Sequence, residues 1–363
     1  MAHTYILGAS GSGKSTLLKN RALQNIRAGH GVCFIDPHGD DIDELMAHIP
    51  RRRVKDTVLF DPTDDHYLIW NPLAHTANYP LTATSLTDAI KDAWGYHGMT
   101  TPVMEMYLYF TIATLIENNA SFYTSLQLLT QFRLPVKDTT LRIFWDNFEA
   151  MTPKERREQT SSTLNKLFTL FADPRLRRLL STSESRIDMA DIVRDKIFLI
   201  RLPQGQLGLS KVSLLGSILL SLIHVACLSR TGPPFHIYVD EFHHFSHSTL
   251  AEMLSGLRKF NVHITLAHQF IAQLDRQLFG SLMGNCATRH VFRVSPEDAR
   301  QFQECKKNGP ICLHELETFS YRTFPWQNRD HDQKAVPLPT PQSPNMPKRI
   351  RNHTHQNYCR ETQ

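Results

Sequence analysis

The sequence predicts an α/β fold in which a mostly parallel sheet is interrupted by an all-helical insertion. Short apolar runs rich in β-branched and large side chains alternate with helical stretches, as in a sheet that helices cover on both faces. The expected strands span residues 4–8, 32–36, 58–60, 196–202, 236–240, 262–267 and 289–294. Between residues 81 and 190 this alternation gives way to successive amphipathic helices. We therefore expect a core made of residues 1–80 and 191–324 and a helical insertion domain at residues 81–190.

Composition is that of an ordinary globular protein. The 363 residues are 41% hydrophobic and 21% charged, and the net charge of +5 permits nucleic-acid binding without arguing for it. Six scattered cysteines form no paired framework, which indicates reduced thiols and a cytoplasmic location. The first expected strand begins within a few residues of Met1, which leaves no room for a signal peptide.

One apolar stretch, residues 212–228, raises the question of a membrane span. Its length of about 17 residues is at the short limit for a spanning helix. Three serines and His224 interrupt it, and it lies between two expected core strands. A buried helix of the α/β core is the better interpretation, so we expect no membrane insertion.

The strongest motif is a glycine-rich loop between the first expected strand and the first expected helix. It matches the phosphate-loop pattern G-x-x-x-x-G-K-[ST] in the setting that the pattern requires. Its residues are Gly8, Ala9, Ser10, Gly11, Ser12, Gly13, Lys14, Ser15 and Thr16. Glycines let backbone N–H groups converge on phosphate oxygens at the positive end of the helix. Lys14 is expected to reach the β- and γ-phosphates and Ser15 to ligate Mg²⁺, which predicts ATP and Mg²⁺ as cofactors.

Two further expected strands end in polar side chains. The strand at 236–240 ends in Asp240 and Glu241, where Asp240 would hold the metal and Glu241 would polarise the attacking water. The next strand leads to Gln269, which we expect near the γ-phosphate as a sensor of hydrolysis. The alternatives are a surface acidic turn for the pair and an ordinary turn residue for the glutamine.

Arg258 lies between the acidic pair and Gln269, at the end of an expected helix. It is a candidate to reach the γ-phosphate bound by a neighbouring subunit, which would make hydrolysis depend on assembly. The alternative is a surface basic pair with Lys259.

Taken together, these motifs resemble the FtsK–HerA superfamily of P-loop ATPases, and most closely the ATPase part of conjugative coupling proteins of type IV secretion (the TraG-like group). The matching segments are residues 8–16, 36–40, 70–73, 196–205, 214–217, 240–241, 258–259, 269 and 292–299. The resemblance implies a RecA-like P-loop NTPase core with ATP bound between the subunits of a hexameric ring and DNA in its channel. It also implies that Arg258 is the arginine acting in trans, with Arg289 and Arg293 as the next candidates.

The resemblance leads to a function, with one alternative. We expect an ATP-dependent DNA translocase that moves DNA through the ring in conjugative transfer, genome packaging or DNA processing. Coupling proteins usually carry a membrane anchor, and none is evident here, so a separate anchoring or loading partner would be needed for secretion. The alternative is an ATP-dependent assembly or gating switch that recruits protein partners without moving DNA.

Other signals are weaker. The Pro-rich and basic segment 325–363 is expected to be disordered, because its composition offers little apolar surface to bury. Basic runs at 51–53 and 306–307 are candidate DNA contacts, although each is more typical of a solvated surface. His243, His244 and His247 lack the further ligands of a metal site, and we expect them to have a structural or supporting role instead.

Overall fold

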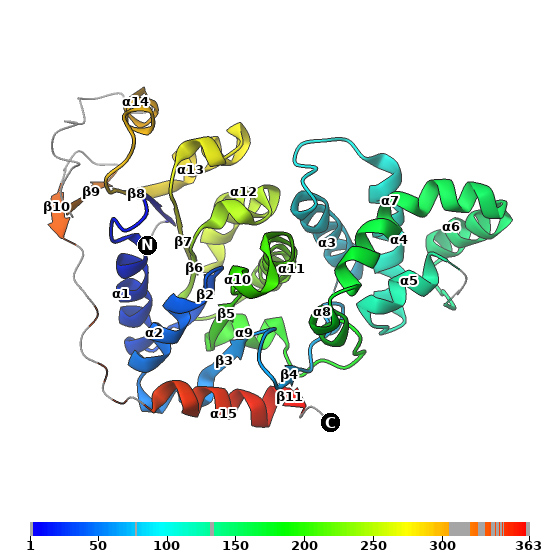
Figure 1. Cartoon of the computed structure of the whole chain (residues 1–363), viewed down its shortest axis with the longest axis horizontal. Helices are drawn as coiled ribbons and strands as arrows, with labels where there is room; N and C mark the ends of the chain where they lie inside the picture. Colours follow the sequence, from blue (N-terminus) through cyan, green and yellow to red (C-terminus); the bar gives the residue numbers. More distant parts are fainter. Residues whose placement is uncertain are drawn as a thin grey trace.

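The computed structural model describes residues 3–76, 78–130, 134–304, 320–325, 331–334, 338, 341, 343 and 345–360. Within these residues the chain forms a nine-stranded sheet of order β10-β9-β8-β1-β7-β6-β2-β5-β3. The seven strands from β8 to β3 in this order are parallel, whereas β9 and β10 are antiparallel additions at one edge. The predicted α/β class with a mostly parallel sheet is confirmed (Figure 1).

Each expected strand is present in the structure. The strands are β1 His3–Leu7, β2 Gly31–Asp36, β3 Thr57–Phe60, β4 Tyr67–Leu68, β5 Ile197–Arg201, β6 Phe235–Val239, β7 Val262–His268, β8 Cys286–Val291, β9 Ser320–Pro325, β10 His331–Lys334 and β11 Cys359–Arg360. The strand expected at 289–294 begins three residues earlier than predicted, at Cys286. Lys306 and Lys307 lie outside the described residues.

Helices cover both faces of the sheet, and alternate strand residues enter two separate cores. Tyr5 and Leu7 of β1 pack into one core with α11 and α12, whereas Ile6 packs into the other with α1 and α2. The helices of the sheet region are α1 Lys14–Arg27, α2 Asp40–His48, α10 Gln204–Leu207, α11 Leu209–Cys227, α12 His247–Gly256, α13 Arg276–Asn285 and α14 Pro296–Glu304.

Helix α11 contains the apolar stretch that raised the membrane question. In the part of the chain that the structure describes, it is the one helix long and apolar enough to span a bilayer by length and composition. It lies inside the fold, with 72% of its apolar window buried, and packs against α3, α9 and α12. This placement matches the expected core helix.

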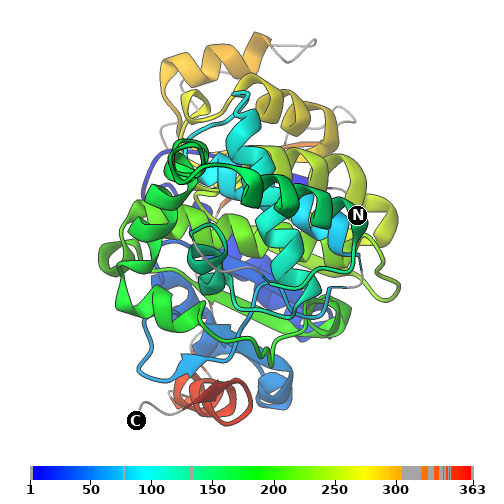
Figure 2. The same ribbon diagram turned by 90° about the vertical axis from the view of Figure 1, so that its right-hand side faces the viewer.

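Between β4 and β5 the regular elements of the described chain are all helices, joined by loops. Its helices are α3 Tyr79–Ala93, α4 Pro102–Glu117, α5 Ser125–Leu128, α6 Thr139–Ala150, α7 Pro153–Phe171, α8 Pro174–Leu179 and α9 Met189–Asp195. Helices α4 to α7 gather at one end of the molecule (Figures 1 and 2), while α3 packs along α11 of the sheet region. Asp92 of α3 accepts hydrogen bonds from the Ser246 and Ser248 hydroxyls at 2.8 and 2.7 Å, which ties α3 to the start of α12. The division into a core and an insertion domain at 81–190 remains a prediction.

The expectation that residues 325–363 are disordered is wrong for the end of the chain. Helix α15 (Met346–Tyr358) packs against β3 and α2, and β11 pairs with β4 (Figure 1). Met346 and Ile350 are buried in the same core as α1, and Thr354 Oγ1 accepts a hydrogen bond from Leu59 N at 3.1 Å. Composition was a poor guide to order in this segment, because a few apolar side chains are enough to dock α15 when polar groups of a distant segment complete the contact.

Candidate active site

The phosphate loop occupies the turn between β1 and α1, as predicted. Gly13 has φ of 102°, a left-handed conformation that favours glycine, and it directly precedes the first residue of α1. At Gly8 a Cβ atom would lie 2.5 Å from Phe292 Cβ, so a larger residue would push the loop away from β8. Ala9 N donates to Arg293 O at 2.7 Å, which further fixes the loop against β8. The loop therefore has the close backbone packing that phosphate binding requires.

Lys14 is 5% exposed and begins α1. Its Nζ donates to Ala9 O at 3.2 Å, so the side chain folds back over the loop. Burial lowers the pKa of Lys14, while the negative charges of Glu241 and Asp240 oppose that shift. An ammonium group is thus held over the phosphate loop, where it would meet bound phosphate oxygens.

Ser15 and Asp240 lie together, although 225 positions separate them. Ser15 Oγ donates to Asp240 Oδ2 at 2.9 Å. Burial, followed by the charges of Glu241 and Asp41, raises the pKa of Asp240 to about 7, and the hydrogen bond from the Ser15 hydroxyl opposes the rise. A hydroxyl and a carboxylate are oxygen ligands of the kind that Mg²⁺ takes. The residues present therefore fit Mg²⁺, which Ser15 and Asp240 would hold.

Glu241 and Gln269 form the next contact of the site. Gln269 Nε2 donates to Glu241 Oε1 at 2.8 Å. The two residues follow the adjacent strands β6 and β7, whose carboxyl ends lie at the same edge of the sheet. Glu241 is 5% exposed and has φ of 43°, which is uncommon for a residue with a side chain. Such backbone strain is typical of functional sites.

Four adjacent strands thus deliver the site. In the order β1, β7, β6 and β2, their carboxyl ends carry the phosphate loop, Gln269, the acidic pair and Asp36. Asp36 Oδ2 accepts a hydrogen bond from Asp41 N at 2.9 Å, which holds the turn into α2 in place. Ligands bind outside the carboxyl ends of strands in open parallel sheets.

Arg258 is not brought to this edge. It is exposed in the short 3₁₀ helix η4 (Leu257–Phe260), which precedes β7. The pKa of His3, at the start of β1, is lowered first by burial and then by the charges of His263 and Arg258, so Arg258 lies near His3. It therefore lies at the amino edge of the sheet, about 20 Å along β7 from Gln269. Arg258 cannot reach the phosphate loop of its own chain. Arg293 is also exposed, beside that loop, and Arg289 lies on β8, where its guanidinium donates to Met283 O.

One residue near the site that the sequence did not indicate is Gln273, in the short 3₁₀ helix η5 (Ile271–Gln273). Its amide contacts His243, which in turn faces Glu241. No motif marks Gln273, because its role depends on a contact across 30 positions of the chain.

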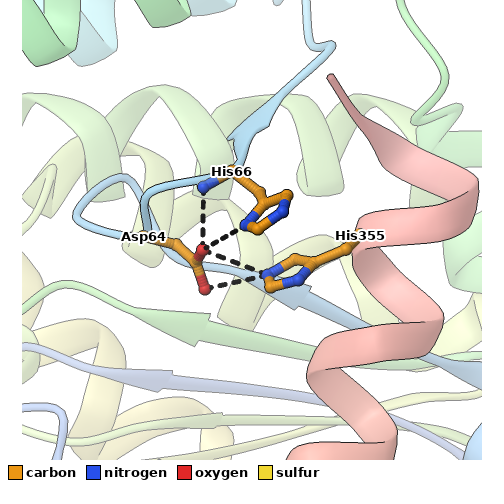
Figure 3. Close-up of side chains that lie close together, drawn as sticks. All are labelled: Asp64, His66 and His355. Carbon is orange, nitrogen blue, oxygen red and sulfur yellow. Dashed lines mark hydrogen bonds and ion pairs between the residues drawn. The ribbon is translucent and has the colours of Figure 1, made fainter. Parts of the chain in front are cut away.

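A separate cluster joins Asp64, His66 and His355 beside α15 (Figure 3). His355 Nε2 lies 3.1 Å from Asp64, and the two imidazole rings stack with centroids 4.0 Å apart and 12° between planes. A metal ion bound by a histidine lies in the plane of the imidazole ring, about 2.0 Å from the nitrogen. Because the rings of His66 and His355 are stacked, no point lies in both ring planes at that distance, and one ion cannot bind both rings. Arg351 also donates to Asp64 at 3.2 Å. This cluster docks α15 and is not built to hold a metal between its histidines.

Comparisons with known proteins find the fold in solved structures. No family model matches the chain, and no curated protein matches its sequence. The bacterial conjugative coupling protein TrwB, in its ADPNP complex, superposes with a TM-score of 0.68 at 17% identity, over 94% of this chain and 87% of TrwB. VirB4 of Thermoanaerobacter pseudethanolicus gives a TM-score of 0.65 at 13% identity, over 94% of this chain and 91% of VirB4.

The class of protein that these matches define is a RecA-like P-loop NTPase fold of the type found in conjugative coupling proteins. The predicted resemblance to that group is confirmed at the level of the fold. At 17% and 13% identity, the likeness is one of fold.

Proposed function

We propose that this chain is an ATP hydrolase that works as a DNA translocase. The observation that carries the proposal is the edge of the sheet where Ser15 Oγ lies 2.9 Å from Asp240 and Gln269 Nε2 lies 2.8 Å from Glu241. P-loop enzymes hydrolyse nucleotides with these components: a phosphate loop, a metal-binding pair, and a carboxylate that contacts an amide. TrwB structures with ADP and Mg²⁺ and with ADPNP support ATP and Mg²⁺ as the cofactors of this shared fold.

Each residue of the site has a role in this proposal. The loop at residues 8–16 holds the phosphates through backbone N–H groups, and Lys14 neutralises charge on the β- and γ-phosphates. Mg²⁺, when bound, neutralises further phosphate charge. Glu241 accepts a proton from the attacking water, and Gln269 leaves Glu241 to contact the γ-phosphate.

The arginine that completes the site comes from a neighbouring subunit. Arg258 lies at the opposite edge of the sheet from its own phosphate loop and is exposed. An exposed guanidinium placed there is available to a second copy packed head to tail, as in a closed ring. We propose a hexamer with DNA in its channel, acting in the cytoplasm in conjugative transfer, packaging or DNA processing, with a separate anchoring or loading partner.

The second candidate is an assembly or gating switch that recruits protein partners on ATP binding. The helices α4 to α7 favour it, because they gather at one end of the molecule, where a partner could contact them (Figure 1). Both candidates use the same nucleotide site, and they differ in whether DNA stimulates hydrolysis.

Steady-state ATP hydrolysis with and without DNA, combined with light scattering after size exclusion, separates the two. The motor predicts strong stimulation by DNA in a ring-sized species and loss of hydrolysis in Lys14→Ala. Nucleotide-dependent protein binding without stimulation by DNA supports the switch. Full hydrolysis by Lys14→Ala overturns the site itself.

Mixed assemblies test the action of Arg258 on a neighbour. Arg258→Ala and Lys14→Ala are each expected to hydrolyse ATP poorly, and mixing them restores part of the activity at interfaces that pair an intact Lys14 with an intact Arg258. Lys259→Ala is the matched control, because Lys259 is equally exposed on the same turn. Absence of rescue in mixed assemblies contradicts action in trans.

A further inference from the structure

The two oxygens of the Glu241 carboxylate have different surroundings. Oε1 accepts the hydrogen bond from Gln269, and Oε2 lies 3.4 Å from His243 Nδ1. Glu241 Oε2 and His243 Nδ1 are both buried from solvent, and neither has a hydrogen-bond partner. A carboxylate oxygen buried in this way is costly unless a donor faces it. The question is therefore whether His243 Nδ1 carries a proton.

The hydrogen bonds of Gln273 indicate which nitrogen of His243 carries the proton. Its Oε1 accepts from Phe270 N at 3.2 Å, and a backbone N–H can only donate, so the orientation of the amide is fixed. The Nε2 group of Gln273 must then be the atom that contacts His243 Nε2, at 2.9 Å. Because an amide NH₂ can only donate, His243 Nε2 accepts. A neutral imidazole whose Nε2 accepts carries its proton on Nδ1.

The surroundings keep this imidazole neutral. Burial, followed by the charges of the neighbouring His244 and His247, lowers the pKa of His243 to about 3. The ring sits in the short 3₁₀ helix η3 (Phe242–His244), directly after the strained backbone of Glu241, so backbone geometry and ring orientation are set together. The Nδ1–H group is therefore a neutral donor that lies 3.4 Å from Glu241 Oε2.

We propose that His243 is a positioning residue that holds the general base Glu241 through Nδ1–H···Oε2, with Gln273 selecting the required tautomer. This inference rests on the proposed ATP hydrolysis. In the structure Gln269 occupies Oε1, the oxygen on the other side of the carboxylate. When Gln269 turns to the γ-phosphate, Oε1 is freed to accept the proton of water. His243 then remains as the donor that keeps Glu241 in place.

Three variants at position 243 test the role. The amide nitrogen of asparagine can stand where Nδ1 stands, whereas that of glutamine reaches the Nε2 side, toward Gln273. We expect His243→Ala and His243→Gln to lower kcat by about tenfold or more, because each loses a hydrogen bond to a charged group. His243→Asn is expected to keep kcat within about threefold of wild type. KM for ATP stays unchanged in all three, since no contact to the nucleotide is lost.

A spectroscopic measurement tests the tautomer without relying on activity or on the variants folding. The protein is labelled with ¹⁵N histidine, and the His243 signals are assigned by their absence in His243→Asn. We expect the shift pattern of a neutral ring protonated at Nδ1 and unprotonated at Nε2. A ring protonated at Nε2 overturns the proposal, as does a kcat in folded His243→Ala equal to that of wild type.

The outcomes distinguish this inference from the proposed function. If wild type hydrolyses ATP and Glu241→Gln does not, the ATPase proposal stands, and unchanged kcat in His243→Ala then removes the role of His243 alone. If wild type hydrolyses no ATP with or without DNA, the proposed function fails, and the tautomer measurement reports only on the resting geometry.

Discussion

Among the buried and half-buried carboxylates of the described residues, two groups have opposite surroundings. The nucleotide-edge carboxylates are Asp36, Asp240 and Glu241, and the helix-docking carboxylates are Asp43, Asp61 and Asp64. At the nucleotide edge, burial together with neighbouring carboxylates raises the pKa of Asp240 to about 7 and also raises the pKa of Asp36. The pKa of Asp240 stays raised even though the Lys14 ammonium is near it.

The helix-docking carboxylates are matched by arginines. Arg351 contacts Asp43 at 2.9 Å and Asp64 at 3.2 Å, and Arg201 contacts Asp43 and Asp61 at 3.2 Å each. Burial alone would raise the pKa of Asp64, but hydrogen bonds from His66 and His355 and the charge of Arg351 lower it. This group is closed by side chains of the chain itself.

The contrast separates a binding site from a structural contact. Carboxylates that remain uncompensated inside a fold require a cation, and keeping them costs stability. Carboxylates that the fold compensates join distant segments, here α15 to the loops after β3. Four predictions test this contrast, from the largest expected effect to the smallest.

Glu241→Gln should affect turnover most. Removing the general base is expected to lower kcat by about 100-fold or more while ATP binding is kept, measured by hydrolysis and by calorimetric titration. Asp64→Asn, from the other group, is the matched control and should hydrolyse ATP as wild type does. Normal turnover in Glu241→Gln would remove it as the base.

Asp240→Asn should stabilise the fold when nucleotide and Mg²⁺ are absent. The amide removes a buried charge, and it can still accept from Glu241 N and donate to Ser15 Oγ, where Asp240 now accepts both bonds. We expect the free energy of unfolding at pH 8 to rise by about 1–3 kcal/mol in urea titrations, with Mg²⁺-dependent hydrolysis lost. A clear loss of stability would show that Asp240 is already compensated.

Arg351→Ala should act in the opposite sense. It leaves Asp43 and Asp64 without their shared partner, and we expect the free energy of unfolding to fall by about 1–3 kcal/mol. ATP hydrolysis should remain, because α15 packs on β3 and α2, away from the phosphate loop. Arg349→Ala, on the same helix, is the control. Unchanged stability in Arg351→Ala would mean that apolar contacts alone dock α15.

The smallest effect is a pH dependence at Asp64. Its pKa is lower in the folded protein than in the unfolded chain, so its stabilising contribution is fully present above the unfolded value of about 3.9. That contribution is lost as pH falls through the folded pKa. The difference in unfolding free energy between wild type and Asp64→Asn, measured from pH 6 to pH 2.5, should therefore shrink toward acid. A difference that stays constant over this range would contradict the ion-pair account.

The contrast also explains what could be predicted from sequence. Lys14, Ser15, Asp240, Glu241 and Gln269 follow short apolar strands, and parallel strands bring their carboxyl ends to one edge, so local pattern sufficed. The docking of α15 could not be predicted, because Arg351 finds its partners almost 300 positions away. The contact of Gln273 with His243 was hidden for the same reason. The trans role of Arg258 depends on a second subunit, which one chain does not contain.

ATP-driven displacement of streptavidin from biotinylated ends of single- and double-stranded DNA tests the central claim most directly. The account predicts that wild type displaces streptavidin only with ATP and Mg²⁺, on at least one kind of DNA, and that Glu241→Gln does not. ATP hydrolysis without displacement on either DNA would contradict the motor and leave the nucleotide site serving a switch.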